Sequence, residues 1–210
     1  MKIYKSFFKR VFDILFSFIA IFAFLPFFLI IAIAIKIDSR GPVFFKQKRY
    51  GRNKKPFNIL KFRSMSVEAP KSVPTYGLVN SDKYITKLGK FLRKTSLDEL
   101  PQLFNIFVGQ MSFIGPRPVI LEEVDLIEER DKYGANALRP GISGWAQING
   151  RDELGYVVKA KYDGEYAEKI SLWFDIKCLF GTVFKVLKRD GVVEGDKVEL
   201  KTEKVEEENG

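Results

Sequence analysis

The sequence predicts an α-rich α+β fold, in which an N-terminal helix hairpin re-enters the membrane and precedes a small cytoplasmic domain with a short β-hairpin. Two observations carry this prediction: a long uncharged apolar run near the N-terminus, and two short apolar strands around a basic turn soon after it. The expected domains are residues 1–36, the basic N-terminus and membrane helix, and residues 37–190, the cytoplasmic domain. Residues 191–210 form an acidic tail with few large apolar side chains, and we expect this tail to be disordered.

The apolar run covers residues 14–35, 22 residues without a charge. At roughly 1.5 Å per residue it can just cross a hydrocarbon layer about 30 Å thick. A removed signal peptide is disfavoured, because the run is longer than the usual h-region and a basic stretch follows it. Basic residues flank both ends: Lys2, Lys5, Lys9 and Arg10 before the run, and Lys36, Arg40, Lys46, Lys48, Arg49, Arg52, Lys54 and Lys55 after it. The positive-inside rule therefore favours the cytoplasm for both ends.

Pro26 lies in the middle of this run, where it removes a backbone hydrogen bond and costs about 3 kcal/mol in a straight helix. A break at Leu25-Pro26 gives two halves of about 12 and 9 residues, each too short to span a bilayer. A re-entrant hairpin agrees with the break and with the charges on both sides. A kinked helix that spans the membrane is the alternative, because proline is tolerated in membrane helices and a large following domain can override the charge bias.

The two strands of the predicted β-hairpin lie within residues 41–65. Strand alternation places Lys61 and Arg63 on one face, which suits a phosphate, although charged residues on a solvated edge strand are equally common. Residues 66–82 carry turn signals and predict a loop, and residues 84–96 predict a short helix with a basic end.

Two adjacent carboxylates, Asp98 and Glu99, stand shortly before Pro101, and Asp98 precedes this proline by three residues. Proline fits a helix only in its first turn, so both carboxylates are expected at a helix start. The free N–H groups and the helix dipole there keep a carboxylate ionised and attract phosphate, and Arg93 adds a positive charge upstream. The alternative is a solvated first turn in which Ser96 and Glu99 form a capping box.

Arg117 stands between two prolines that restrict its backbone. A rigid loop that presents one guanidinium suits bidentate phosphate recognition, and a surface arginine in a turn is the alternative. Residues 119–138 predict a charged helix, and a glycine-rich loop follows. This loop offers five side chains for contacts: Arg139, Trp145, Gln147, Asn149 and Arg151. Residues 170–191 predict an amphipathic helix closed by Gly191, whose apolar side belongs either to the core or to a membrane interface.

Composition limits the available chemistry. The chain has no histidine and a single cysteine, Cys178, which excludes a Ser-His-Asp triad, a Cys-His pair, a His/Cys zinc cluster and an internal disulfide. Catalysis would have to use carboxylates, lysine, arginine, hydroxyls or a hard metal held by oxygen. The net charge is +9, and the tail from Gly191 onward carries seven acids and three bases, so the rest of the chain is more basic still. Such a body favours anionic partners, among them nucleic acid, anionic lipid and phosphorylated small molecules.

Three segments, "KFRSM", "RKTSLDELPQLFNIFVGQMSFIGPRPV" and "LRPGISGWAQINGRDEL", follow a basic apolar N-terminus with a central proline. In this order they closely resemble the bacterial sugar transferases called monotopic phosphoglycosyl transferases, over residues 5–190. The resemblance implies transfer of a sugar 1-phosphate from a UDP-sugar to undecaprenyl phosphate, with release of UMP, as the first membrane step of capsule, exopolysaccharide, O-antigen or glycoprotein assembly. It implies UDP-sugar, undecaprenyl phosphate and inner-membrane lipid as partners, no nucleic acid, and a catalytic domain that faces the cytoplasm.

The resemblance also implies roles for single residues. Asp98 is expected to be the nucleophile that carries the phosphosugar, with Glu99 in support and Mg²⁺ as the cofactor at these two carboxylates. Arg93 and Arg117 match the arginines near the phosphates, and Lys61 or Arg63 is expected to help to cancel their charge. The family has a re-entrant helix broken near a proline, often Ser-Pro; here the pair is Leu25-Pro26, which puts the detail of the kink in doubt.

Two other classes of function compete with this one. A membrane-anchored binding module would use its basic surface to attract anions without catalysis. A structural subunit of a polysaccharide-assembly complex would carry Asp98 and Glu99 only as a capped helix start. Neither alternative predicts turnover or a requirement for Asp98.

Overall fold

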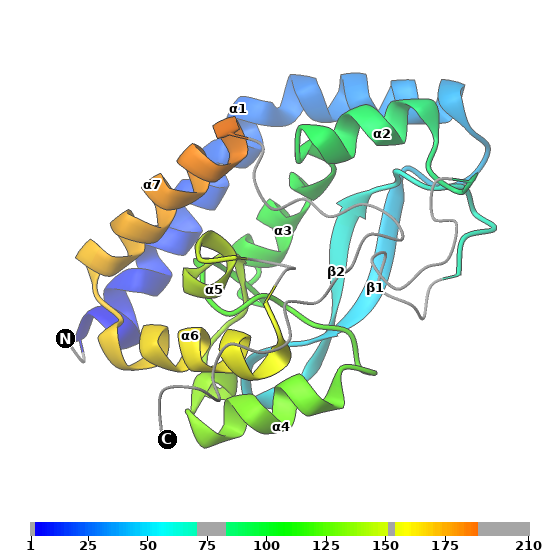
Figure 1. Ribbon diagram of the computed structural model, residues 1–210. Coiled ribbons are helices and arrows are strands. Elements are labelled where there is room, and N and C mark those ends of the chain that lie inside the picture. Colours follow the sequence, from blue (N-terminus) through cyan, green and yellow to red (C-terminus); the bar gives the residue numbers. More distant parts are fainter. Residues whose placement is uncertain (1–2, 71–82, 151–153, 189–210) are drawn as a thin grey trace.

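The computed structural model describes residues 3–70, 83–150 and 154–188. It is a helix-rich α+β structure, as predicted, with one long N-terminal helix (Figure 1). The helices are α1 (Lys9–Asp38), α2 (Lys87–Lys94), α3 (Gln102–Phe107), α4 (Val124–Lys132), α5 (Trp145–Ile148), α6 (Tyr156–Lys169) and α7 (Leu172–Lys188). The strands are β1 (Phe44–Tyr50), β2 (Pro56–Phe62), β3 (Ser112–Ile114) and β4 (Gly141–Ser143). The predicted acidic tail, the closing Gly191 and most of the predicted loop at 66–82 lie outside the described residues.

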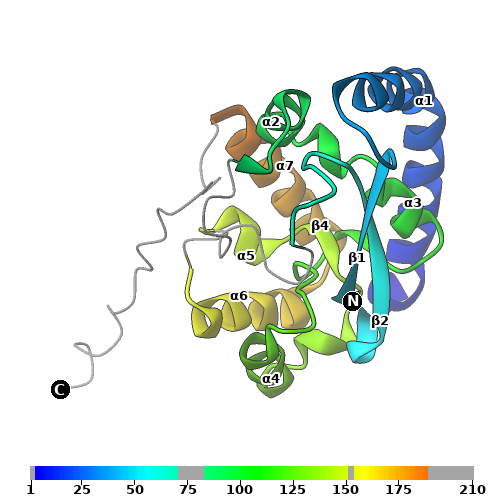
Figure 2. The same ribbon diagram turned by 90° about the vertical axis from the view of Figure 1, so that its right-hand side faces the viewer.

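Helix α1 runs without interruption through Pro26. The predicted break into two short halves is therefore not observed; the helix bends instead, and its second half turns across the top of the molecule (Figures 1 and 2). A bend is the expected result where proline removes one hydrogen bond and crowds the preceding turn. Phe28, Ile31 and Ile35, spaced three and four apart, are buried on one side of the second half. Packing of this side onto the domain keeps the helix continuous.

The predicted β-hairpin is confirmed. Strands β1 and β2 pair antiparallel from Phe44 with Phe62 to Tyr50 with Pro56. The free edge of β2 is covered by α3, because the amide of Asn105 donates to the carbonyl of Asn58 (2.8 Å) and its oxygen accepts from the N–H of Leu60 (2.9 Å). The hairpin thus lies against α3 (Figure 2), and Phe62 of β2 contacts Phe28 of α1.

The second, smaller sheet was not predicted. Strands β3 and β4 pair in parallel: β4 lies within what the sequence indicated only as a glycine-rich loop, β3 just precedes the Arg117 loop, and strands of three residues give no periodic signal. Glycine permits their close approach: a Cβ atom on Gly141 would lie 2.2 Å from the amide nitrogen of Gly115. The pairing brings the loop after β4 beside the loop that carries Arg117.

The predicted helices of the C-terminal half are confirmed in type. Helix α4 occupies the middle of the predicted range 119–138, and α7 occupies the predicted amphipathic segment. The apolar surface of α7 is only partly core: Cys178 belongs to a buried cluster and Phe174 packs against it, but six large apolar side chains are exposed, namely Leu172, Trp173, Leu179, Phe180, Val183 and Phe184. We call these six residues the α7 stripe. Trp173 alone is 80% exposed.

Candidate active site

Asp98 and Glu99 lie in a single 3-10 turn, Leu97–Glu99, between α2 and α3. Pro101 is the N-cap of α3, so the two carboxylates immediately precede the helix rather than stand in its first turn. Ser96 adopts a left-handed backbone conformation (φ +56°), and its side chain makes no capping hydrogen bond. The capping-box alternative is therefore wrong, and the two acids need another explanation.

The carboxyl of Asp98 is almost fully buried, 8% exposed. Burial raises its pKa to about 6; the positive charge of Lys61 opposes this rise, the negative charge of Glu99 adds to it, and Arg93 opposes it. The expectation that the helix start keeps this carboxylate fully ionised is thus incomplete, because desolvation outweighs the favourable charges. The fold holds a carboxylate where its charge is costly, which is typical of a functional site.

Lys61 forms an ion pair with Glu99. Its Nζ lies 2.7 Å from Oε1 of Glu99, and the two side chains are 20% and 15% exposed. Arg93, in the last turn of α2, lies near enough for its charge to lower the pKa of Asp98. The structure therefore brings together four predicted residues, and we call Asp98, Glu99, Lys61 and Arg93 the acidic site.

Arg63, two residues after Lys61, does not share this position. Its guanidinium is buried against the C-terminal end of α1, where Nη1 donates to the carbonyl of Arg40 (2.6 Å) and Nη2 donates to the carbonyl of Ser39 (2.7 Å). The side-chain oxygen of Ser39 accepts a further hydrogen bond at 2.9 Å. Strand alternation placed both cations on one face, but Arg63 follows the last residue of β2 and reaches α1 instead. These contacts tie the guanidinium of Arg63 to the end of α1, where Ser39 is the C-cap residue, and we call them the C-terminal anchor.

Arg117 lies in a different loop, between β3 and α4, and is half-buried. Its carbonyl accepts a hydrogen bond from Nη1 of Arg130 at 3.1 Å, so the loop is tied to α4. In the glycine-rich segment, the predicted contact residues bond within the chain. Arg139 donates to the carbonyl of Gly109, Trp145 to Glu165, Gln147 to the carbonyl of Gly115 and Asn149 to the carbonyl of Trp145. Arg151 lies outside the described residues.

Comparisons with known proteins identify the family of this chain. The model of the family described as bacterial sugar transferase matches residues 4–189. This chain belongs to the bacterial sugar transferase family. It is 43% identical over 184 residues to the UDP-glucose:undecaprenyl-phosphate glucose-1-phosphate transferase of Escherichia coli, covering 84% of this chain and 39% of that protein. It is 42% identical over 197 residues to an uncharacterized sugar transferase of Haemophilus influenzae, covering 87% of this chain and 41% of that protein.

A shorter relative matches over most of its own length. The exopolysaccharide production protein ExoY of Rhizobium meliloti is 36% identical over 189 aligned residues, and the match covers 83% of this chain and 83% of that protein. The chain thus spans about two fifths of the two longer relatives and most of the shorter one.

The sequence did not predict the contacts that hold distant segments of the chain together. Arg130 on α4 pairs with Asp163 on α6. The Nε atom of Arg130 donates to Oδ2 of Asp163 (2.8 Å), and Nη2 of Arg130 lies 2.6 Å from the same oxygen. The two side chains are 5% and 1% exposed, so this is a buried ion pair. Partners 33 residues apart on two helices give no local signal, and the sequence indicated Arg130 only as part of a charged helix.

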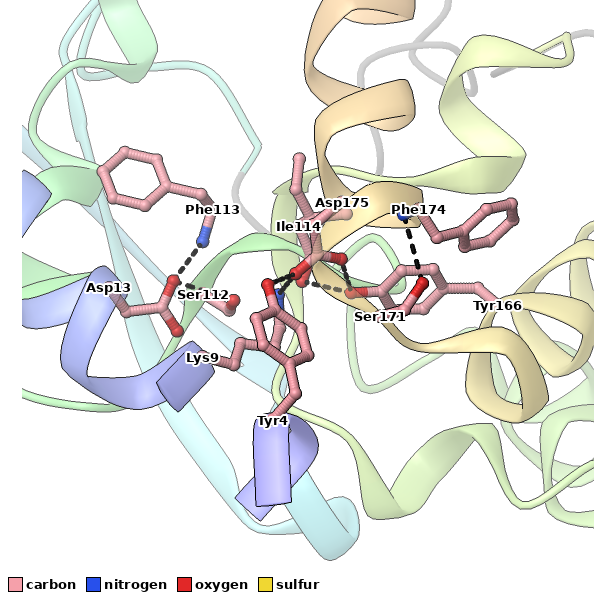
Figure 3. Close-up of polar contacts among 10 residues, drawn as sticks. All are labelled: Tyr4, Lys9, Asp13, Ser112, Phe113, Ile114, Tyr166, Ser171, Phe174 and Asp175. Atoms are coloured by element: carbon pink, nitrogen blue, oxygen red, sulfur yellow. Dashed lines mark hydrogen bonds and ion pairs between the residues drawn. The ribbon is translucent and has the colours of Figure 1, made fainter. Parts of the chain in front are cut away.

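A second missed cluster fixes the other end of α1 (Figure 3). Asp175 on α7 accepts hydrogen bonds from Tyr4 (2.7 Å) and Tyr166 (2.6 Å) and forms an ion pair with Lys9 (2.6 Å). One turn further along α1, Oδ1 of Asp13 accepts from the hydroxyl of Ser112 and from the N–H of Phe113 on β3. We call the contacts of Asp175 and Asp13 the N-terminal anchor.

Proposed function

We propose that this chain transfers a sugar 1-phosphate from a UDP-sugar to undecaprenyl phosphate, with Asp98 as the covalent nucleophile. The observation that carries the proposal is a nearly buried carboxylate whose charge is favoured by two nearby cations, Lys61 and Arg93, in a chain without histidine and with its one cysteine buried. The name of the Escherichia coli relative supports glucose as the first sugar to test.

In the first step a carboxylate oxygen of Asp98 attacks the phosphorus that bears the sugar. A P–O bond forms to Asp98, the P–O bond to UMP breaks, and UMP leaves with the electron pair. In the second step an oxygen of undecaprenyl phosphate attacks the same phosphorus, and the Asp98 carboxylate leaves unchanged. Both steps bring one anion to another, so cations at the site lower the barrier.

The neighbours of Asp98 suit these steps. Lys61 and Arg93 oppose the rise in its pKa, so that most Asp98 side chains remain ionised near neutral pH. Burial removes water from the carboxylate, which protects an acyl phosphate from hydrolysis until the lipid arrives. Glu99, held by Lys61, keeps negative charge beside Asp98 and favours binding of a metal cation at the pair.

Mg²⁺ fits the donor set at Asp98 and Glu99. Within the described parts of the chain no group of three or more His, Cys, Asp or Glu side chains is placed to hold a metal ion. Mg²⁺ needs fewer protein ligands than that, since it commonly uses one or two carboxylates together with water and substrate phosphates. Bound at the two carboxylates, it would supply positive charge to the diphosphate.

We further propose that α1 enters and leaves the membrane on one side. One helix, Tyr4–Asp38, is long and apolar enough to cross a membrane, and most of its large apolar side chains are exposed. However, its start is held by the N-terminal anchor and its end by the C-terminal anchor, both on the same domain. A spanning helix would have to give up one anchor. The bend in α1 and the α7 stripe then meet the cytoplasmic leaflet of the inner membrane, which places Asp98 beside its lipid substrate.

The test is UMP release by purified full-length chain in nanodiscs that contain undecaprenyl phosphate, UDP-glucose and Mg²⁺. Asp98→Asn should lower the rate by at least about three orders of magnitude, because it removes the nucleophile. Asp131→Asn, which alters an exposed carboxylate paired with Lys54, is the matched control and should retain the wild-type rate. Equal rates for wild type and Asp98→Asn would refute the role of Asp98, and a panel of other UDP-sugars would identify a different donor.

A further inference from the structure

The loop that carries Arg117 is held through four consecutive carbonyl groups, those of residues 116–119. The carbonyl of residue 116 accepts from the N–H of Gly141 (2.9 Å), and that of residue 117 accepts from Nη1 of Arg130 (3.1 Å). The carbonyl of residue 118 accepts from Nη1 of Arg49 (3.3 Å), and that of residue 119 accepts from the N–H of Tyr50 (2.9 Å). The donors come from β4, α4 and β1, so three separate elements fix one short segment.

These hydrogen bonds matter because the segment has few backbone N–H groups that can donate. Pro116 and Pro118 have no N–H group and fix their φ angles, so the carbonyls are the main groups by which the backbone on either side of Arg117 can be held. With every carbonyl from 116 to 119 engaged, the Cα atom of Arg117 has a defined position. A guanidinium that starts from a fixed backbone loses less entropy when it binds a ligand.

Two of the four donors are arginine side chains that are themselves held in place. All three guanidinium nitrogens of Arg130 are used, two on Asp163 and one on the carbonyl of Arg117. Arg49, at the end of β1, also donates from Nη2 to Gln47 (2.6 Å) and lies 4.0 Å from Glu123. Glu123 in turn accepts from the N–H of Ile120, just beyond the segment. The support therefore extends from the hairpin to α6.

We propose that Arg49 and Arg130 are positioning residues that place the guanidinium of Arg117 against the diphosphate of the sugar donor. The inference rests on the proposed function and on the expectation, implied by the family resemblance, that Arg117 is a phosphate ligand. Arg49 and Arg130 act only through the main chain of residues 116–119 and do not touch the substrate.

Arg49 gives the cleaner experiment, because removal of Arg130 leaves Asp163 buried without its partner and can unfold the chain. Arg49→Met removes the bond to the carbonyl of Pro118, and we expect kcat/KM for UDP-glucose to fall on the order of tenfold, since a small displacement of a binding group has a large effect on rate. Arg49→Lys retains a donor and should recover part of the loss. Arg52→Met is the matched control: Arg52 also donates to a backbone carbonyl, that of Ala137, but outside the segment.

A double-mutant cycle separates positioning from general stability. If Arg49 acts through Arg117, Arg49→Met should have little further effect on kcat/KM in an Arg117→Lys background, while the melting temperatures of the two single variants remain close to wild type. An equal tenfold loss in both backgrounds, or no loss in Arg49→Met alone, would overturn the proposal. Absence of UMP release by the wild type and by Arg52→Met would instead overturn the proposed function, and this proposal with it.

Discussion

Lys61 and Arg63 are two residues apart on the same strand end, yet one belongs to the acidic site and the other to the C-terminal anchor of α1. Arg63 donates to chain carbonyls, and its charge stabilises the end of a helix. Lys61 stands beside two carboxylates, one of which has its pKa raised to about 6. A cation whose hydrogen bonds are mainly to backbone groups supports the fold, whereas a cluster that keeps a costly buried charge is prepared for a ligand.

The largest expected effect is the pH dependence of the free energy of unfolding that Asp98 contributes at the acidic site. The raised pKa of Asp98 means that the protonated form is favoured in the folded chain, so this contribution to stability is complete below pH about 4 and is lost as the pH rises through about 6. Asp98→Asn should therefore become more stable than wild type as the pH rises. At about 1.4 kcal/mol per pH unit the gain approaches about 3 kcal/mol.

Thermal unfolding between pH 4 and pH 7, in detergent with a chelator to remove divalent cations, measures this gain. Asp131→Asn provides the control, because the pKa of Asp131 is lowered by Lys54 and the sign of its effect is opposite. If the difference in melting temperature between Asp98→Asn and wild type were the same at pH 4 and at pH 7, ionisation of Asp98 would not destabilise the folded chain.

A substitution in the C-terminal anchor should lower the stability of the chain, whereas Asp98→Asn should raise it. Arg63→Met removes the hydrogen bonds to Ser39 and Arg40, and the free energy of unfolding should fall by about 2 kcal/mol. For a chain of this size the melting temperature should fall by roughly 4–8 °C. Lys61→Met is the matched control and should lower the melting temperature less, while it lowers UMP release more. The reverse order would remove the distinction between the two cations.

At the N-terminal anchor we expect a smaller and more local effect. Asp175→Asn weakens the hold on Tyr4, Lys9 and Tyr166, so backbone amides near the start of α1 should exchange hydrogen on the order of tenfold faster. Glu129→Gln, which alters an ion pair on the surface of α4, should leave this exchange unchanged. Exchange at wild-type rates in Asp175→Asn would mean that the cluster does not anchor the helix.

The sequence predicted those parts of the structure that depend on local pattern. The β-hairpin, α2, the amphipathic α7 and the position of Asp98 and Glu99 before Pro101 all follow from spacing and turn residues. The bend at Pro26 was predicted as a break, because the packing of Phe28, Ile31 and Ile35 onto the domain cannot be read from the run itself.

Contacts between distant segments could not be predicted in the same way. Arg130 with Asp163, and Lys9 with Asp175, join residues whose neighbours in sequence give no sign of the pairing. The same holds for the pKa of Asp98, where burial outweighs the helix start that the sequence indicated. The four residues of the acidic site were found from motif resemblance and local geometry, and their supports were not.

The smallest effect concerns the α7 stripe. The chain has two tryptophans, so Trp145→Phe leaves Trp173, 80% exposed, as the single reporter. In nanodiscs with brominated lipids its fluorescence should be quenched, because we propose that the stripe lies in the membrane interface. Trp173→Phe leaves Trp145, which packs on Phe174, and should show little quenching. An unquenched Trp173 with the emission of an indole in water would place the stripe away from the membrane.

The most direct test of the central claim is to locate the transferred group. Full-length chain in nanodiscs without undecaprenyl phosphate should, after a single turnover with UDP-glucose and Mg²⁺, gain the mass of one hexose phosphate, and peptide mapping should place it on Asp98. The Asp98→Asn chain should gain nothing. A hexose phosphate found on another residue, or UMP release that requires undecaprenyl phosphate and never leaves an adduct on the protein, would contradict the account.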